Sequence, residues 1–171
     1  MQNGGRYEVF QRTAGTEGRK GLLEAAKRAA ENGHGLLGFV GDKNGHLPFQ
    51  TADGQYNPVP GFYRRLEEYS PDDLRENPTL ADMTEAALTV LEAAAEGFWL
   101  MVEAGEVDWA NHDNNIDASI GAVNSGDAAF DVIIDWVNRH NGWDDTAVIL
   151  TADHGHYLML EDPTVLIKPS E

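Results

Sequence analysis

The sequence of 171 residues contains no cysteine. This absence excludes disulfide bonds, thiolate nucleophiles and zinc sites built from cysteine. A metal ion bound by this chain would need the carboxylates of aspartate and glutamate or the imidazoles of its 6 histidines. Ligands of that kind suit a hydrolytic metal site better than a structural zinc site.

Basic residues and long apolar segments are also scarce. The chain has 12 lysine and arginine residues against 29 aspartate and glutamate residues, which gives a net charge of −17. A surface this acidic repels nucleic acid and anionic lipid, so neither is an expected partner. No apolar run approaches the ~20 residues of a membrane-spanning helix, and residues 1–15 lack the apolar centre of a signal peptide. The length and the hydrophobic fraction of 42% are those of one globular domain over residues 1–171.

Segments with helical periodicity alternate with short, continuous apolar runs. Apolar residues at helical spacing predict helices over residues 18–33, 77–97 and 115–140. Continuous apolar runs predict buried strands over residues 35–41, 98–103 and 146–152. This order predicts an α/β fold with a mainly parallel sheet flanked by helices. Residues 42–77 are predicted to be a long loop, and the acidic run 64–78 is interpreted as solvated loop.

Local signals predict how the helices begin, end and pack. Gly33 is a suitable stop for the first helix. Either Asn77 or Thr79 can cap the second helix, and Asp82 follows three residues after Thr79. The third helix has an apolar stripe that includes Ile120 and Val123, and Asp127 falls on it. We expect Asp127 to be a core carboxylate held by a salt bridge or hydrogen bonds; the alternative is a position close to a bound metal.

The predicted strand 98–103 ends in a cluster of metal-binding residue types. It ends at Glu103, and Asp108 and His112 follow with the spacing D-x-x-x-H. If that segment begins the next helix, both side chains share one face and offer an oxygen and a nitrogen to Zn²⁺. Glu103 offers only oxygen, which suits Mg²⁺ better. Alone, the D-x-x-x-H pair is a weak signal, because most such pairs bind nothing.

A second cluster follows the predicted strand 146–152. Asp153 and His154 are adjacent, and His156 follows two residues later, where it could orient a ligand or a substrate. The carboxyl ends of parallel strands lie at one edge of a sheet, so the two clusters are expected to converge there. The alternative is an ordinary polar junction between strand and loop. Two clusters in one chain favour a metal site.

Other motifs do not support a different chemistry. The sequence has no G-x-x-x-x-G-K-[ST] loop and no G-x-S-x-G nucleophile motif. His34, His46 and His140 have no carboxylate or second histidine at ligand spacing, so we interpret them as structural or solvent-exposed.

The segments PTLADMTEAAL, GFWLMVEAGEVDWANHDNN and VILTADHGH, in this order, resemble the alkaline phosphatase family. LLGFVGDKNGHLPF and NGGRYEVF extend the resemblance over nearly the whole chain. It implies an incomplete alkaline-phosphatase-like fold. It also implies a metal-dependent phosphate monoester hydrolase that uses two zinc ions, a magnesium ion and a phosphoserine intermediate.

The resemblance assigns the metal ligands. Asp108 and His112 would bind the zinc that activates the attacking water. Asp153 and His154 would bind the zinc that activates the nucleophile, and Glu103 would bind Mg²⁺. Small phosphate monoesters are the implied substrates, and a homodimer in the periplasm or outside the cell is implied by the habit of the family.

Two further positions lie inside the matching motifs. His156 would stand near the first zinc without binding it directly. Trp109 occupies a position where many members have Lys or His, and we assign it no role.

The chain also departs from the family pattern. The family nucleophile is a serine in an Asp-Ser-Ala context, and the serines of this chain lie elsewhere: Ser70, Ser119, Ser125 and Ser170. We therefore predict no catalytic residue in this chain and expect the nucleophile, an arginine and an aspartate upstream, and a histidine downstream. The chain is expected to be a truncated part of the enzyme that is inactive alone. The alternatives are a non-catalytic metal-binding remnant and a related enzyme: a sulfatase, a nucleotide pyrophosphatase or a cofactor-independent phosphoglycerate mutase.

Overall fold

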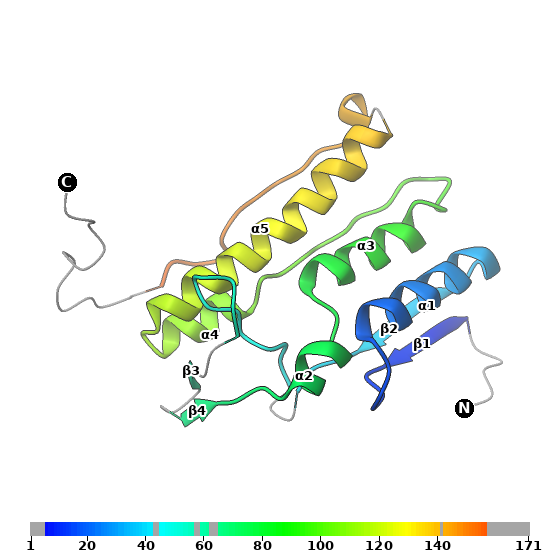
Figure 1. The fold of residues 1–171 in the computed structure, drawn as a ribbon. Helices are drawn as coiled ribbons and strands as arrows, with labels where there is room; N and C mark the ends of the chain where they lie inside the picture. The colour runs from blue at the N-terminus through cyan, green and yellow to red at the C-terminus, as the bar shows by residue number, and fades with distance from the viewer. Residues whose placement is uncertain (1–5, 43–44, 57–58, 62–64, 141, 157–171) are drawn as a thin grey trace.

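The computed structural model describes residues 6–42, 45–56, 59–61, 65–140 and 142–156. Within them, the helices α1 (Gly18–Asn32), α3 (Leu80–Leu91) and α5 (Ile116–Arg139) lie side by side (Figure 1). Helix α3 is the middle one, because it packs against both α1 and α5. The predicted helices 18–33, 77–97 and 115–140 are thus confirmed, although the second ends at Leu91, before Gly97.

A small parallel sheet lies against α1. Its first strand, β1 (Tyr7–Gln11), is missing from the sequence-based prediction, and it pairs with β2 (Gly35–Phe39), which is predicted as part of 35–41. Helix α1 connects the two strands, and Phe10 of β1 packs in the core with Leu22 of α1. Gly33 ends α1 at a φ of 63°, the left-handed conformation that glycine adopts without steric cost. The predicted stop is therefore confirmed.

The prediction of one long loop over residues 42–77 is wrong in its second half. Strands β3 (Val59–Gly61) and β4 (Arg65–Glu67) form an antiparallel pair, and helix α2 (Pro71–Glu76) follows. The acidic run 64–78 therefore contains helix α2. Ser70 caps α2 by accepting a hydrogen bond from the N–H of Asp73, whose carboxylate accepts one from the N–H of Ser70. Proline at the first helical position favours the same start.

Of the two caps that the sequence predicts, Asn77 and Thr79, it is Thr79 that caps helix α3. The side chain of Thr79 accepts a hydrogen bond from the N–H of Asp82, and the Asp82 carboxylate accepts one from the N–H of Thr79. This reciprocal pair satisfies backbone donors that a helix start leaves unpaired.

The capping box of α2 predicts a pH dependence of stability. Hydrogen bonds from Ser70 lower the pKa of Asp73, and Arg12, at 2.8 Å, lowers it further. A carboxyl with a depressed folded-state pKa stabilises the fold above its unfolded value of about 3.9 and loses this effect as the pH falls through the folded value. The Asp73→Asn variant should therefore be less stable than the parent chain by about 1 kcal/mol at pH 6. Urea denaturation across pH 2–6 measures this difference, which should shrink below about pH 4.

The exposed Asp127→Asn change on α5 removes the same charge without touching a helix cap, and serves as the control. A stability difference for Asp73→Asn that is constant over the whole pH range would contradict the assignment.

Only the C-terminal part of the predicted apolar stripe of α5 packs: Val137 is fully buried, whereas the N-terminal part of the stripe is exposed. Ile120 and Val123 are exposed, and the other buried positions are small residues such as Gly121, Ala122 and Ala129. Asp127 is exposed as well, so the prediction of a core carboxylate is wrong. The physical reason is close approach: small side chains let α5 contact the loop at Gln50, where larger residues could not fit.

The predicted strands 98–103 and 146–152 do not form in the described part of the chain. Both segments run without regular secondary structure and are drawn as long connections in Figure 1. Trp99 is 82% exposed and Leu150 is 78% exposed. A strand needs a neighbour for its backbone hydrogen bonds, and the described sheets contain only the pairs β1–β2 and β3–β4. The fold is thus α/β, with a smaller parallel sheet than predicted.

None of the described helices is long and apolar enough to cross a membrane.

Candidate metal centre

Helix α4 (Glu106–His112) presents Asp108 and His112 on one face. They are one helical turn apart, and the Nε2 atom of His112 lies 3.4 Å from Oδ2 of Asp108. The predicted geometry of the D-x-x-x-H pair is therefore confirmed. Asp108 lies in the first turn of α4 and His112 in the last. A negative charge near the N-terminus of a helix and a positive charge near its C-terminus both interact favourably with the helix dipole.

Contacts to α5 and to a loop hold this short helix in place. Ala110 is buried with Phe49 and Ala118 in a small core cluster. The Ser119 hydroxyl donates a hydrogen bond to the side-chain oxygen of Asn111 at 2.8 Å, which connects α4 to α5. The sequence analysis missed this support, since no pattern in the sequence pairs an asparagine with that serine.

The segment after residue 152 brings two histidines to Asp108. The Nε2 atom of His154 lies 3.6 Å from Oδ1 of Asp108, and Nδ1 of His156 lies 3.8 Å from the same oxygen. The rings of His112 and His156 meet edge to face, with centroids 4.6 Å apart. Three imidazoles therefore surround one carboxylate. Residues far apart in the sequence converge here, but not at the edge of a sheet as predicted, because neither strand forms in the described part of the chain.

The carboxylate of Asp108 contains an atom without a hydrogen bond. Its Oδ1 is buried and makes no hydrogen bond to any described residue. A buried carboxylate oxygen is costly unless a hydrogen-bond donor or a cation compensates it. Ligand atoms of Asp108, His112 and His156 all lie within 4.8 Å of one another. An oxygen and two imidazole nitrogens form a donor set that suits Zn²⁺, so the residues present fit that ion.

Three predicted ligands, Glu103, Asp153 and His154, lie outside this group of three. Glu103 is exposed and is not among the described residues that the cluster brings together. The side chain of Asp153 is 87% exposed, and its Oδ1 accepts a hydrogen bond from the N–H of His154. Their assignment as ligands stays a prediction.

His154 lies beside the group of Asp108, His112 and His156, and the pKa of its imidazole is raised. Its Nδ1–H donates a hydrogen bond to the carbonyl oxygen of Gly155, and this bond raises the pKa of the His154 imidazole. The negative charges of Asp153 and Asp108 raise it further.

Trp109 of α4 belongs to a cluster of three rings with His46 and Phe49. The ring of His46 lies 5.5 Å from that of Trp109 and 4.7 Å from that of Phe49, measured between centroids. His46 thus has the structural role that the sequence analysis gave it. Trp109 remains without an assigned role.

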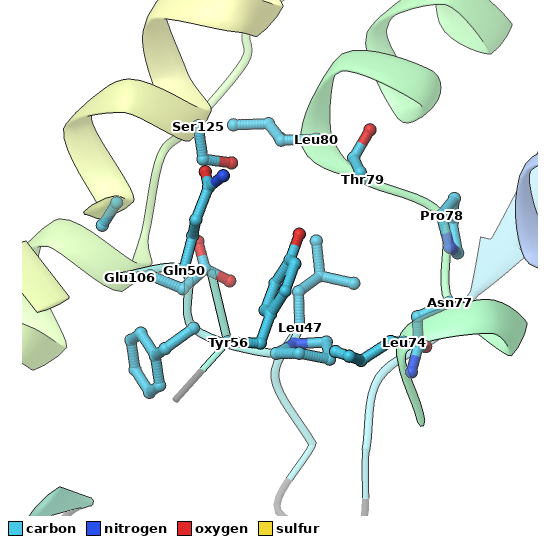
Figure 2. Close-up of a pocket in the computed structure, with 13 residues that line it drawn as sticks. Leu47, Gln50, Tyr56, Leu74, Asn77, Pro78, Thr79, Leu80, Glu106 and Ser125 are labelled. Atoms are coloured by element: carbon cyan, nitrogen blue, oxygen red, sulfur yellow. The ribbon is translucent and has the colours of Figure 1, made fainter. Parts of the chain in front are cut away.

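A pocket separate from the cluster lies between the loop 47–56, α3, α4 and α5 (Figure 2). Tyr56 points into it, with Gln50 and Ser125 on one side (Figure 2). Partial burial raises the pKa of the Tyr56 phenol, and the negative charge of Asp82 adds to this effect. None of the three clustered ligands lines this pocket.

The sequence matches the model of the alkaline phosphatase family over residues 14–166. It is 36% identical to alkaline phosphatase 3 of Bacillus subtilis (strain 168) over 83 residues, which are 48% of this chain and 17% of that protein. It is 34% identical to alkaline phosphatase of Escherichia coli (strain K12) over 130 residues, which are 75% of this chain and 26% of that protein. Streptomycin-6-phosphate phosphatase of Streptomyces griseus is 30% identical over 135 residues, which are 75% of this chain and 29% of that protein.

The chain thus spans less than a third of the length of these relatives. The family match nevertheless includes every residue of the candidate metal centre, from Glu103 to His156. The resemblance of the sequence motifs is confirmed by this match. The chain belongs to the alkaline phosphatase family.

Proposed function

We propose that this chain carries part of the metal centre of a phosphate monoester hydrolase. The observation that carries the proposal is the Asp108 carboxylate, which three imidazoles approach at 3.4, 3.6 and 3.8 Å and whose Oδ1 makes no hydrogen bond to a described residue. The family match supports a phosphatase-type reaction. Small phosphate monoesters are the proposed substrates, and the name of the Streptomyces griseus relative supports this class.

In this proposal, side chains of this chain bind a zinc ion directly. Asp108 supplies the negative charge, and His112 supplies a neutral nitrogen at 3.4 Å from that carboxylate. By the same proposal, Asp153 and His154 belong to a second zinc site and Glu103 to a magnesium site. Zinc bound in such a centre supplies a Lewis acid that lowers the pKa of bound water and offsets charge on the transferring phosphoryl group. It would also offset the net charge of −17, which otherwise repels a phosphorylated substrate.

A second candidate is metal binding without turnover. The described serines favour it, because their contacts lie outside the cluster. Ser70 caps α2, Ser119 donates to Asn111, and Ser125 lines the separate pocket. Ser170 lies outside the described residues. A homodimer and a location in the periplasm or outside the cell remain proposals from the family.

Phosphate binding tests the proposal on the purified chain. Calorimetry should detect binding of inorganic phosphate when Zn²⁺ is present and none when it is removed by a chelator. The His112→Ala variant should lose this binding, because it loses an imidazole ligand beside Asp108. The His140→Ala variant is the matched control, since His140 packs on Trp136 at the far end of α5. Phosphate binding that is independent of zinc would contradict the proposal.

An aryl phosphate assay at alkaline pH with Zn²⁺ and Mg²⁺ distinguishes the two candidates. Turnover that is lost in Asp153→Ala supports hydrolysis by this chain. Zinc-dependent phosphate binding without turnover supports the non-catalytic candidate.

A further inference from the structure

The pocket between the loop 47–56 and the helices α3, α4 and α5 contains polar groups that no described residue satisfies. Tyr56 points into this pocket, and Glu106 and Ser125 lie on one side of it (Figure 2). The Tyr56 phenol, the Glu106 carboxylate and the Ser125 hydroxyl make no hydrogen bond to a described residue, and all three residues are partly buried. Polar groups withdrawn from water are costly without a partner, so the pocket favours a ligand that hydrogen-bonds to them.

The charge around these groups is negative. Among the described residues, no lysine, arginine or histidine lines the pocket, so the Glu106 carboxylate has no cation beside it there. Burial raises the pKa of the Tyr56 phenol and the negative charge of Asp82 adds to this effect, so the phenol is neutral at pH 7. The net charge of −17 attracts cations to the whole surface. A positively charged ligand is therefore favoured over a neutral or negative one.

The size of the pocket and its apolar lining restrict the ligand further. The cavity has a volume of about 40 Å³, and a water-sized group needs about 10–15 Å³, so about three non-hydrogen atoms fit. Leu47, Leu74 and Pro78 supply apolar lining that a short alkyl chain can contact. A primary ammonium group has three N–H donors, which equals the number of polar groups without a hydrogen bond.

We infer that this pocket binds a small primary ammonium ion. The Glu106 carboxylate supplies the opposite charge, the oxygens of Tyr56 and Ser125 accept hydrogen bonds from the ammonium, and the alkyl chain packs on the apolar lining. The inference does not rest on the proposed function, because none of the three clustered ligands lines the pocket. A metal chelator can therefore be present throughout the test.

NMR tests the inference on the full chain. The chain is labelled with ¹³C-tyrosine and titrated with ethylammonium chloride at constant ionic strength, and Tyr56→Phe identifies the Tyr56 signal among the 5 tyrosines. Ethylammonium should shift the Tyr56 signal with a Kd of about 1 mM or weaker, because so small a ligand has few atoms to contribute. Ethanol has the same number of non-hydrogen atoms without the charge, and should bind at least about 10-fold more weakly.

Two results of this titration would overturn the inference. One is a Tyr56 signal that ethylammonium does not shift up to about 100 mM. The other is binding of ethanol as tight as that of ethylammonium, since the carboxylate would then contribute nothing.

Variants of the lining test which groups hold the ammonium. Glu106→Gln keeps the size of the side chain and removes its charge, so Kd should rise by about 10-fold or more, and Ser125→Ala should raise it by about 2- to 10-fold. Glu96→Gln is the matched control, because Glu96 is exposed and lies outside the pocket. Unchanged signals of the other tyrosines show that each variant is folded. Equal Kd values for Glu106→Gln and Glu96→Gln would contradict the inference, since the attraction would then come from the whole surface.

Discussion

Replacing Asp108 by alanine should weaken Zn²⁺ binding by roughly 100- to 1000-fold. Asp108 supplies the carboxylate that all three imidazoles of the cluster approach, at 3.4, 3.6 and 3.8 Å. Zinc sites with four ligands bind with about 10–16 kcal/mol, so one ligand contributes about 3 kcal/mol. Titration with a competing chelator at pH 7.5 measures the change in dissociation constant.

Thermal unfolding provides a second measurement of the same change. An ion that binds only the folded chain raises the midpoint of unfolding. Zinc should therefore raise the midpoint of the parent chain and leave that of Asp108→Ala nearly unchanged. The control is Asp127→Ala, which removes a carboxylate from an exposed position of α5. Equal zinc stabilisation of Asp108→Ala and the parent chain would show that the ion binds elsewhere.

The Gly121→Ala variant should be less stable than the parent chain by about 1–3 kcal/mol, the range for overpacking a tight contact. Gly121 lies on the buried face of α5, and a Cβ atom there would meet the carbonyl oxygen of Gln50 at 1.9 Å. No side chain fits at that distance, so the loop or the helix must move. Alanine otherwise favours a helix by about 0.5–1 kcal/mol, so a loss of stability isolates the steric effect.

Urea denaturation of this variant checks the prediction. Asn124→Ala is the matched control, because residue 124 is an exposed position of the same helix. The control should be as stable as the parent chain or slightly more stable, since alanine has the higher helix propensity. If Gly121→Ala also gained stability, the loop containing Gln50 would not be packed against α5 as the structure shows.

The helices were predictable because their signals are local. The capping boxes of Ser70 with Asp73 and of Thr79 with Asp82 each involve residues three positions apart. The second box predicts the start of α3, whereas the first lies in the acidic run 64–78, whose charge by itself predicts a solvated loop. The same signal, a serine followed by proline and an aspartate at the third position, could have predicted α2.

The strands were less predictable because pairing depends on distant residues. The run 35–41 forms β2 because β1 lies beside it, whereas 98–103 and 146–152 are equally apolar and stay unpaired among the described residues. Apolar composition predicts that a segment can be a strand; a partner within hydrogen-bonding distance decides whether it is one. The exposure of Ile120 and Val123 on α5 has a related cause, since the neighbours of this part of the helix pack on small residues such as Gly121 and Ala122.

The sequence by itself determined the composition and the motifs of this protein. The absence of cysteine restricts its metal ligands to carboxylates and imidazoles, and the spacing of Asp108 and His112 places them one helical turn apart. The motifs also identify the family, which the match over residues 14–166 shows. These properties depend on residue types and on neighbours within a few positions.

Only the tertiary structure decided which residues meet. It brings His154 and His156 to the carboxylate of Asp108, leaves Asp153 in solvent and buries an oxygen of Asp108 that makes no hydrogen bond to a described residue. The physical reason is that the position of Asp108 follows from the packing of α4 on α5 and on the loop at Phe49, which are distant in the sequence. No local pattern in the sequence specifies that packing.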